Sequence, residues 1–407
     1  MTRLLFPLKS VNFVRLFLVS SIFIAPLVTI APRASANGAD TTVLSGLLAP
    51  AETVTSSQGD VFFTQLVSSA QVDIFSLAPG SHSPVDVFRL IGLQPYINDI
   101  HVDSSGNLLF ITSVATASDG SARHWDLTRL DSTSGVATVL VTTSGAPSAL
   151  VPPNYFIGVG GGLTSGTEID LAGVDSAGTI YFSEHSIVNG NQVAYLLALQ
   201  PGSSTPTVVA TFDLSGYDSI EFVNVASRGD VFFIENGSLH QYSTSGLRVL
   251  IPKADGPGPA GVDAAGNLYV LETSRVDSTG FGCATSTTES VVRFSAQSLW
   301  STTPVPEVVS QATYDGFVAH WFGSSSFFRA SNQGNVYWVQ TSISCLTKNF
   351  TPNKVMGSTR GGGQAVLYQE NGNVSSPDTQ GPIGIATFGA FVYIASVASG
   401  SLLRITN

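Results

Sequence analysis

The chain has 407 residues, of which 43% are hydrophobic and 11% are charged, and 28 acidic against 17 basic residues give a formal net charge of −11. The apolar content is sufficient for a full core, which excludes a disordered protein, and the acidic balance argues against nucleic acid as a partner. Two cysteines and no regular glycine period exclude disulfide-dense and collagen-like chains.

The first 36 residues have the pattern of a signal peptide. They carry four basic residues and no acidic one, and an apolar stretch over residues 16–30 is interrupted by Pro26. The stretch is followed by Ala34-Ser35-Ala36, a small-x-small cleavage pattern. We therefore expect a secreted or periplasmic protein that begins at Asn37, has a net charge of −15 and has no integral membrane segment. The alternative is an uncleaved membrane anchor, but Pro26 makes the stretch short for a spanning helix.

A glycine-centred pattern then recurs seven times. The clearest copies are HVDSSGNLLFIT (101–112), GVDSAGTIYFSE (173–184), NVASRGDVFFIE (224–235) and GVDAAGNLYVLE (261–272), and weaker ones lie at 54–65, 329–340 and 384–395. The glycine permits a positive φ, the preceding Asp or Ser closes the turn onto backbone amides, and the flanking residues alternate with period two. Each copy therefore predicts a β-hairpin, and the chain is predicted to be all β.

The central glycines, which we call anchor glycines, lie at 59, 106, 178, 229, 266, 334 and 389. Spacings of 37 to 72 residues suit four short strands per copy, as in the blades of a β-propeller. We expect a single propeller domain over residues 37–407 with seven blades, or with six. The last copy is one strand short, so the segment 41–48 is predicted to complete the last blade and close the ring.

These repeats resemble those of NHL, streptogramin lyase-like and SMP-30/gluconolactonase-like propellers. The resemblance implies the fold, and it implies either a metal-dependent lactonase or lyase or a module that binds proteins or glycans. The chain departs from the lyase pattern Glu-x-His, because Glu184 and His185 are adjacent, and it mostly lacks the arginine that opens the third strand of NHL repeats.

Three carboxylates occupy equivalent places, six residues after their anchor glycines: Glu184, Glu235 and Glu272. Together they predict a site for a divalent cation, Ca²⁺ first, because Ca²⁺ prefers several oxygen ligands. The alternative is that each carboxylate accepts hydrogen bonds from its own loop.

Polar residues also occupy the predicted innermost strands. Five residues before their anchors lie His101, Asn224 and Arg329, and slightly further from the anchors lie Asp99, Asp170 and Glu221. We predict that these residues face a central channel and bind ligand, with His101 or His185 as general base near neutral pH. The alternative is that they are hydrogen-bonded plugs of a water-filled tunnel.

Two further predictions concern the long loops. His320 and Trp321 are candidates for a ligand-stacking surface, and His185, His124 and His320 offer zinc ligands without a recognisable spacing. Cys283 and Cys345 lie in corresponding loops of neighbouring repeats, and export favours a disulfide between them.

The main functional hypothesis is an exported, monomeric propeller that binds a small molecule, glycan or protein on the face of the long loops. The alternative is a metal-dependent hydrolase or lyase.

Overall fold

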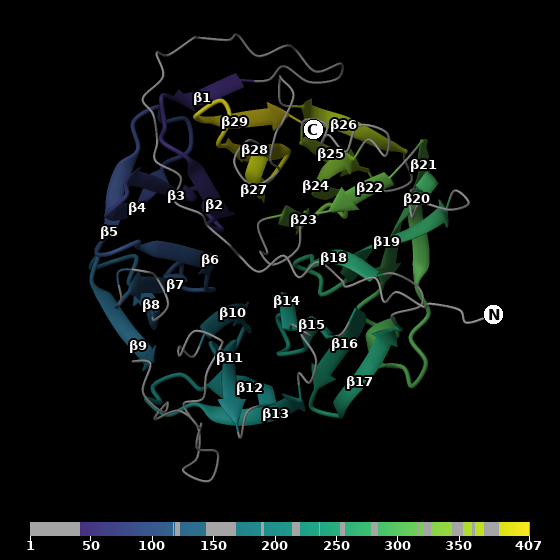
Figure 1. Cartoon of the computed structure of the whole chain (residues 1–407), viewed down its shortest axis with the longest axis horizontal. Coiled ribbons are helices and arrows are strands. Elements are labelled where there is room, and N and C mark those ends of the chain that lie inside the picture. The colour runs from purple at the N-terminus through teal and green to yellow at the C-terminus, as the bar shows by residue number, and fades with distance from the viewer. Residues whose placement is uncertain are drawn as a thin grey trace, which may run out of the picture. The chain divides into compact units, whose positions relative to one another are not determined.

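The strands between residues 41 and 406 form seven antiparallel sheets around a common centre (Figure 1). The structure is a computed structural model and describes residues 41–116, 118, 123–143, 168–188, 191–213, 220–235, 237–252, 257–277, 284–315, 317–320, 327–343, 353–359, 363–369 and 382–406. Each sheet is a blade, so this part of the chain is a seven-bladed β-propeller. The predicted fold class and the count of seven are confirmed.

The blades share one strand order from centre to rim. The innermost strands of blades 1 to 7 are β2 (Pro50–Thr55), β6 (Tyr96–Val102), β10 (Glu168–Val174), β14 (Ile220–Val225), β18 (Pro257–Val262), β23 (Phe328–Ala330) and β27 (Pro382–Phe388). The second strands are β3 (Val61–Ser68), β7 (Leu108–Ala115), β11 (Ile180–Val188), β15 (Val231–Glu235), β19 (Leu268–Asp277), β24 (Val336–Ile343) and β28 (Phe391–Ser396). The third strands are β4 (Gln71–Leu77), β8 (Arg123–Leu130), β12 (Asn191–Leu199), β16 (Ser238–Ser243), β20 (Ala284–Phe294), β25 (Lys354–Ser358) and β29 (Ser401–Thr406). The outermost strands are β5 (Val85–Ile91), β9 (Ala137–Thr143), β13 (Thr207–Asp213), β17 (Gly246–Ile251), β21 (Glu307–Asp315), β26 (Gln364–Gln369) and, in blade 7, β1 (Thr41–Ser45).

Blade 6 differs from the other six, because two separate strands pair with the inner edge of β24. They are β22 (Phe317–His320) and β23. The repeat pattern predicts one inner strand here, and this division is the main departure from it.

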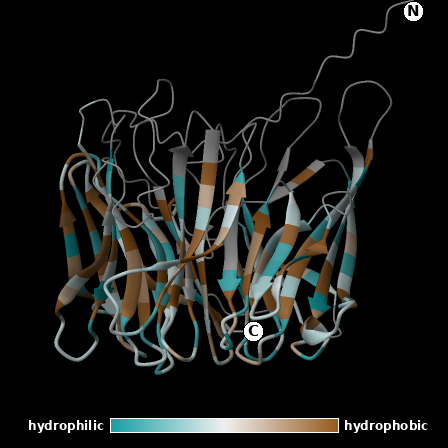
Figure 2. Cartoon of the chain, turned by 90° about the horizontal axis from the view of Figure 1, so that it is seen from below, coloured by the Kyte–Doolittle hydropathy of each residue, from teal (hydrophilic) through white to brown (hydrophobic). Residues whose placement is uncertain are grey.

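The turns between first and second strands have the predicted chemistry. The anchor glycines have φ values from +58° to +92°. In blade 3, Oδ1 of Asp175 accepts hydrogen bonds from the backbone N–H of Ala177 and of Thr179, over 2.9 and 2.8 Å. Asp103 and Asp263 make the same pair of bonds in blades 2 and 5. We call the end of the propeller that carries these turns the turn end. It is the lower end in Figure 2, where the C-terminus is labelled.

The ring is closed by the N-terminal strand, as predicted. Strand β1 pairs antiparallel with β29, with Thr41 opposite Arg404 and Ser45 opposite Ser401. Leu44 of β1 is buried with Val61 of blade 1 and Leu402 of blade 7. The segment 41–45 is therefore the fourth strand of the last blade.

The hydrophobic core is divided into seven clusters, and each lies between two neighbouring blades. Between blades 3 and 4, for example, Phe212 and Phe233 make an edge-to-face contact with ring centroids 5.1 Å apart. Blades therefore stabilise each other through face-to-face burial.

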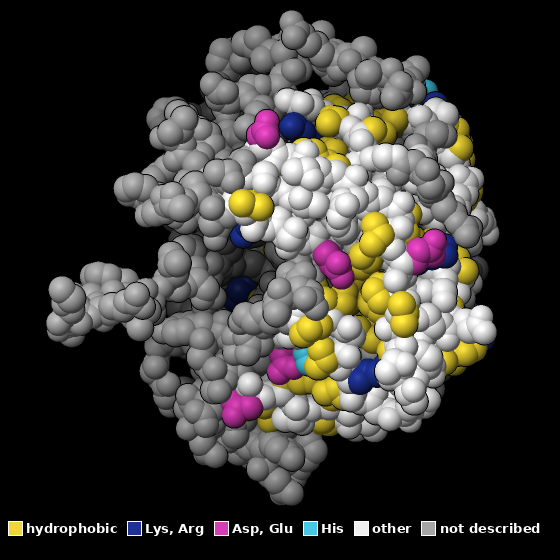
Figure 3. Space-filling model, turned by 90° about the vertical axis from the view of Figure 1, so that its right-hand side faces the viewer, with side chains coloured by type: hydrophobic (Ala, Val, Ile, Leu, Met, Phe, Trp, Pro, Cys, Tyr) yellow, Lys and Arg dark blue, Asp and Glu magenta, His cyan; other side chains and the backbone are white. Residues whose placement is uncertain are grey.

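The rim is partly apolar. Exposed valines lie on several outermost strands, including Val139, Val249 and Val308, and Figure 3 shows apolar side chains scattered over one side of the molecule. β-branched residues suit extended strands, which accounts for them. In the described part of the chain, no helix is long and apolar enough to cross a membrane.

Candidate functional site

Arg329 lies at the centre of the propeller and connects three blades. From β23 in blade 6, its Nε donates to the carbonyl oxygen of Ile385 in blade 7 over 2.9 Å, and its Nη2 donates to the carbonyl oxygen of Thr53 in blade 1 over 3.1 Å. Burial lowers the pKa of Arg329 to about 10, although the negative charge of Glu52 acts in the opposite direction. The guanidinium therefore remains charged at neutral pH and supports the centre of the ring.

His101 on β6 is buried near this cation. Burial, and then the positive charge of Arg329, lower the pKa of His101 to about 3. A Cβ placed on Gly173 of blade 3 would lie 3.4 Å from Nδ1 of His101, so the imidazole packs against the next inner strand. At neutral pH this histidine is neutral and a weak base, whereas the sequence predicts a base that titrates near neutral pH.

Asp99 connects blades 2 and 3. It is buried, has a φ of +52°, and its Oδ2 accepts hydrogen bonds from Nδ2 of Asn98 over 3.1 Å and from the N–H of Leu171 over 3.3 Å. A positive φ is costly for a residue with a side chain, and these bonds compensate for it. Glu221 lies on β14 opposite Ile234, and its side chain is outside the described part of the chain.

The three carboxylates of the predicted Ca²⁺ site point into three different blade interfaces. Side chains alternate along a strand, so Glu184 shares its face with Phe182, Glu235 with Phe233, and Glu272 with Val270. Phe182 packs toward blade 2, Phe233 toward blade 3, and Val270 toward blade 4.

The structure therefore does not bring these carboxylates together. Among the residues that it describes, no three His, Cys, Asp or Glu side chains are placed to hold a metal ion. These residues do not fit the predicted cation as one site.

The interface between blades 3 and 4 instead contains two histidine–carboxylate pairs. In blade 3, Nε2 of His185 lies 3.6 Å from Oδ2 of Asp170, and in blade 4, Nε2 of His240 lies 3.4 Å from Oε2 of Glu235. The His240 ring stacks on Phe233, with centroids 5.3 Å apart and planes 9° apart.

Strand alternation places both pairs on walls that face each other. Asp170 and His185 lie on the face of blade 3 that carries Ala194, and Phe233 packs against that face. Burial lowers the pKa of His240, which makes its imidazole neutral at neutral pH. The four side chains remain partly accessible, with exposed fractions between 11% and 23%.

A second polar network lies between blades 5 and 6. Oε2 of the fully buried Glu289 accepts a hydrogen bond from Nε2 of Gln340 over 2.8 Å. Burial raises the pKa of Tyr314 to about 12, and the negative charge of Glu289 adds to this. The hydroxyl of Tyr314 donates to Oε1 of Gln364 over 2.8 Å, so this network connects the two blades internally.

Three of these residues were not predicted as site residues from the sequence: Glu52, His240 and Glu289. Glu52 lies seven residues before its anchor glycine, the same offset as Asp99, so the repeat alignment could have found it. His240 and Glu289 lie on third strands, where the repeat pattern is weak.

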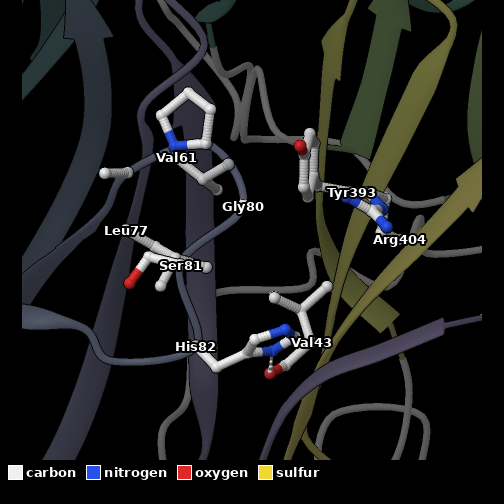
Figure 4. Close-up of a pocket in the computed structure, with 10 residues that line it drawn as sticks. Val43, Val61, Leu77, Gly80, Ser81, His82, Tyr393 and Arg404 are labelled. Carbon is white, nitrogen blue, oxygen red and sulfur yellow. Dashed lines mark hydrogen bonds between the residues drawn. The ribbon is translucent and has the colours of Figure 1, made fainter.

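Two cavities among the described residues are relevant to the candidate site. One, of about 150 Å³, lies at the seam where β1 closes the ring, next to His82, Tyr393 and Arg404 (Figure 4). There, Nδ1 of His82 lies 3.1 Å from the carbonyl oxygen of Val43, so the ring connects blade 1 to the closing strand. The other, of about 140 Å³, lies on the axis beside Asn224 and Arg329.

The remaining predictions fall outside the described residues. The structure does not describe Trp321, Cys283 or Cys345. It describes only the backbone of His320, which pairs with Gln340 of β24. The disulfide, the ligand-stacking surface and the signal peptide therefore stay predictions.

Comparison with known proteins agrees with the fold. The sequence matches no protein-family profile and no curated protein. Similar solved structures include an oligogalacturonate lyase in complex with manganese, at a TM-score of 0.56 and 9% identity over 93% of this chain and 98% of that one. They also include a virginiamycin B lyase from Staphylococcus aureus, with a TM-score of 0.47 and 13% identity over 91% and 99%, and a gluconolactonase-like protein, with a TM-score of 0.41 and 9% identity over 91% and 93%.

The chain is thus a seven-bladed β-propeller, and the oligogalacturonate lyase is similar to it in fold. The fold expected from the resemblance of its repeats is confirmed.

Proposed function

We propose that this protein is a propeller hydrolase or lyase whose acid–base groups lie between blades 3 and 4. The observation that supports this most is the presence of two histidine–carboxylate pairs, Asp170–His185 and Glu235–His240, on facing walls of one interface. The pairs are partly exposed, as groups that meet a substrate must be.

His185 is the proposed general base. A carboxylate beside an imidazole orients the ring and stabilises the imidazolium that forms when the ring takes a proton. Asp170 is close enough to His185 for this electrostatic effect, because its Oδ2 lies 3.6 Å from Nε2, although that distance is longer than a hydrogen bond. Nδ1 of His185 is then the atom that removes a proton, either from water in ester hydrolysis or from a carbon next to a carboxylate in elimination.

His240 is the proposed second acid–base group. Its lowered pKa keeps it neutral, and because Nδ1 is buried, Nε2, which lies 3.4 Å from Oε2 of Glu235, is the atom proposed to exchange a proton. The stacked Phe233 fixes the ring plane. The proton that an imidazole takes from the substrate or from water leaves it as an imidazolium, which can then pass that proton to the leaving group.

The test is a panel of lactones and uronic-acid oligosaccharides, assayed with the full chain. Lactone opening is followed by acid release and elimination by the ultraviolet absorbance of the unsaturated product. Each assay is run with a chelator, with Ca²⁺ and with Mn²⁺, because manganese is bound in the oligogalacturonate lyase of the same fold.

His185→Asn is expected to lower kcat by about 10² to 10⁴. The matched control is His124→Asn, because Nε2 of His124 lies 2.9 Å from Oδ1 of Asp126 in blade 2, a similar pair away from the proposed site. Full activity in His185→Asn, or no turnover of either substrate class with any ion, would overturn the proposal.

The binding function expected for the long loops stays a prediction, because most of these loops lie outside the described residues.

A further inference from the structure

The axial cavity carries an inference that is independent of the proposed enzyme site. It is lined by the last residues of three inner strands, Thr55, Val262 and Ala330, so it lies at the turn end of the axis. The proposed acid–base groups, by contrast, lie between two blades.

Two hydrogen-bond donors remain available in this cavity. Arg329 uses Nε and Nη2 on the carbonyl oxygens of Ile385 and Thr53, which leaves Nη1 without a hydrogen bond among the residues that the structure describes. Asn224 accepts the backbone N–H of Val225 with its Oδ1 over 2.7 Å, and within the described part of the chain its donor group Nδ2 has no acceptor.

The charge of the cavity favours an anion. Its described lining includes Arg329 and no acidic side chain, and Glu52, whose negative charge acts on Arg329, is not among the lining residues. The hydroxyl of Thr55 already donates to the carbonyl oxygen of Thr387 over 2.8 Å, which fixes the wall between blades 1 and 7. A buried cation is stabilised by an oxyanion that takes its remaining donors.

We propose that this cavity binds a small carboxylate, held by the guanidinium of Arg329 and the side-chain amide of Asn224. A planar carboxylate offers two acceptor oxygens, and guanidinium and amide groups match it geometrically. About 140 Å³ holds several water molecules or an organic acid of a few carbon atoms, such as acetate or lactate.

The experiment measures the thermal unfolding midpoint of the full chain in increasing sodium acetate or sodium lactate, with sodium chloride at equal ionic strength as reference. At ten times the Kd, a carboxylate is expected to raise the midpoint by about 2 °C over chloride, and above the Kd the rise continues with the logarithm of the carboxylate concentration. Isothermal titration gives the Kd, which we expect to be about 1 mM for so small a ligand.

Asn224→Asp is the main variant. It keeps the oxygen that accepts the N–H of Val225 and puts a negative charge into the cavity, so the fold is retained and carboxylate affinity falls at least about tenfold. Ala330→Leu fills the cavity without a charge and is expected to abolish the shift as well. The matched control is Arg404→Gln, which removes an arginine at the seam and leaves the shift intact.

A carboxylate shift equal to that of chloride in the unaltered protein would overturn the proposal, as would an unchanged shift in Asn224→Asp. Neither outcome bears on the enzyme proposal. That proposal depends on substrate turnover by the unaltered protein and on the loss of turnover in His185→Asn.

Discussion

The guanidinium of Arg329 in blade 6 donates a hydrogen bond from Nη2 to the carbonyl oxygen of Thr53 in blade 1, across 276 positions of the chain. Because its Nε also reaches Ile385 in blade 7, one side chain connects the three blades around the closure of the ring. We expect Arg329→Met to lower the free energy of unfolding by about 3 kcal/mol, since two carbonyls lose a charged donor. Urea denaturation measures this loss.

The control for this prediction is Arg404→Met. The guanidinium of Arg404 lies 4.9 Å from the ring centroid of Phe391, a contact worth about 1 kcal/mol or less. Equal losses in the two variants would contradict the bracing role of Arg329.

Stability should fall in acid because of His101. Its pKa is about 3 in the folded chain and 6.5 in the unfolded chain, so below pH 6.5 the unfolded state binds the extra proton. The stabilising contribution of the neutral ring is complete above pH 6.5 and is lost as the pH falls toward 3. Between pH 7 and pH 4 the loss is on the order of 3 kcal/mol.

The measurement compares urea unfolding at pH 7 and pH 4 for the unaltered protein and His101→Gln. Carboxylates titrate in both proteins, so the difference between their pH slopes isolates His101. Parallel slopes would show that the imidazole does not carry this dependence.

Gly384 on β27 has no room for a larger residue. A Cβ there would lie 2.5 Å from Oγ1 of Thr53 and 2.7 Å from the carbonyl oxygen of Ala51, on the neighbouring inner strand. Gly384→Ala is expected to lower the free energy of unfolding by about 1 to 3 kcal/mol through overpacking. Gly363→Ala, where no atom lies within 4 Å of the added carbon, should leave stability within about 0.5 kcal/mol, and thermal unfolding distinguishes the two.

Closure of the ring can be tested at Leu44. This side chain is buried in the seam between blades 7 and 1, whereas Leu48 is 57% exposed. Leu44→Ala is expected to cost about 2 to 4 kcal/mol and Leu48→Ala less than about 0.5 kcal/mol. If both variants unfold at the same urea concentration, β1 does not contribute to the stability of the closed ring.

The sequence predicts the parts of this structure that depend on local chemistry. Asp175 and its equivalents are followed by an anchor glycine at a fixed distance, and this spacing is sufficient to define the turn. The closing strand is also predictable, because the last repeat lacks a strand and an apolar segment precedes the first.

The sequence predicts the candidate site less well, because the site depends on which way side chains face between blades. Glu184, Glu235 and Glu272 have equivalent places in their repeats, yet equivalence in a ring directs each toward a different neighbour. Arg329 and His101 affect each other's charge only because folding brings blades 2 and 6 to one centre. No local pattern contains that information.

The pairing of Thr41 with Arg404 also sets an order for assembly in the cell. A ribosome that adds about 5 to 20 residues per second needs roughly 20 to 70 s between making the two partners. During that interval β1 has no partner strand, although blades 1 to 6 can already be complete. The ring is therefore closed only after the last blade has been made, and until then β1 is an unpaired strand edge at which chains can aggregate.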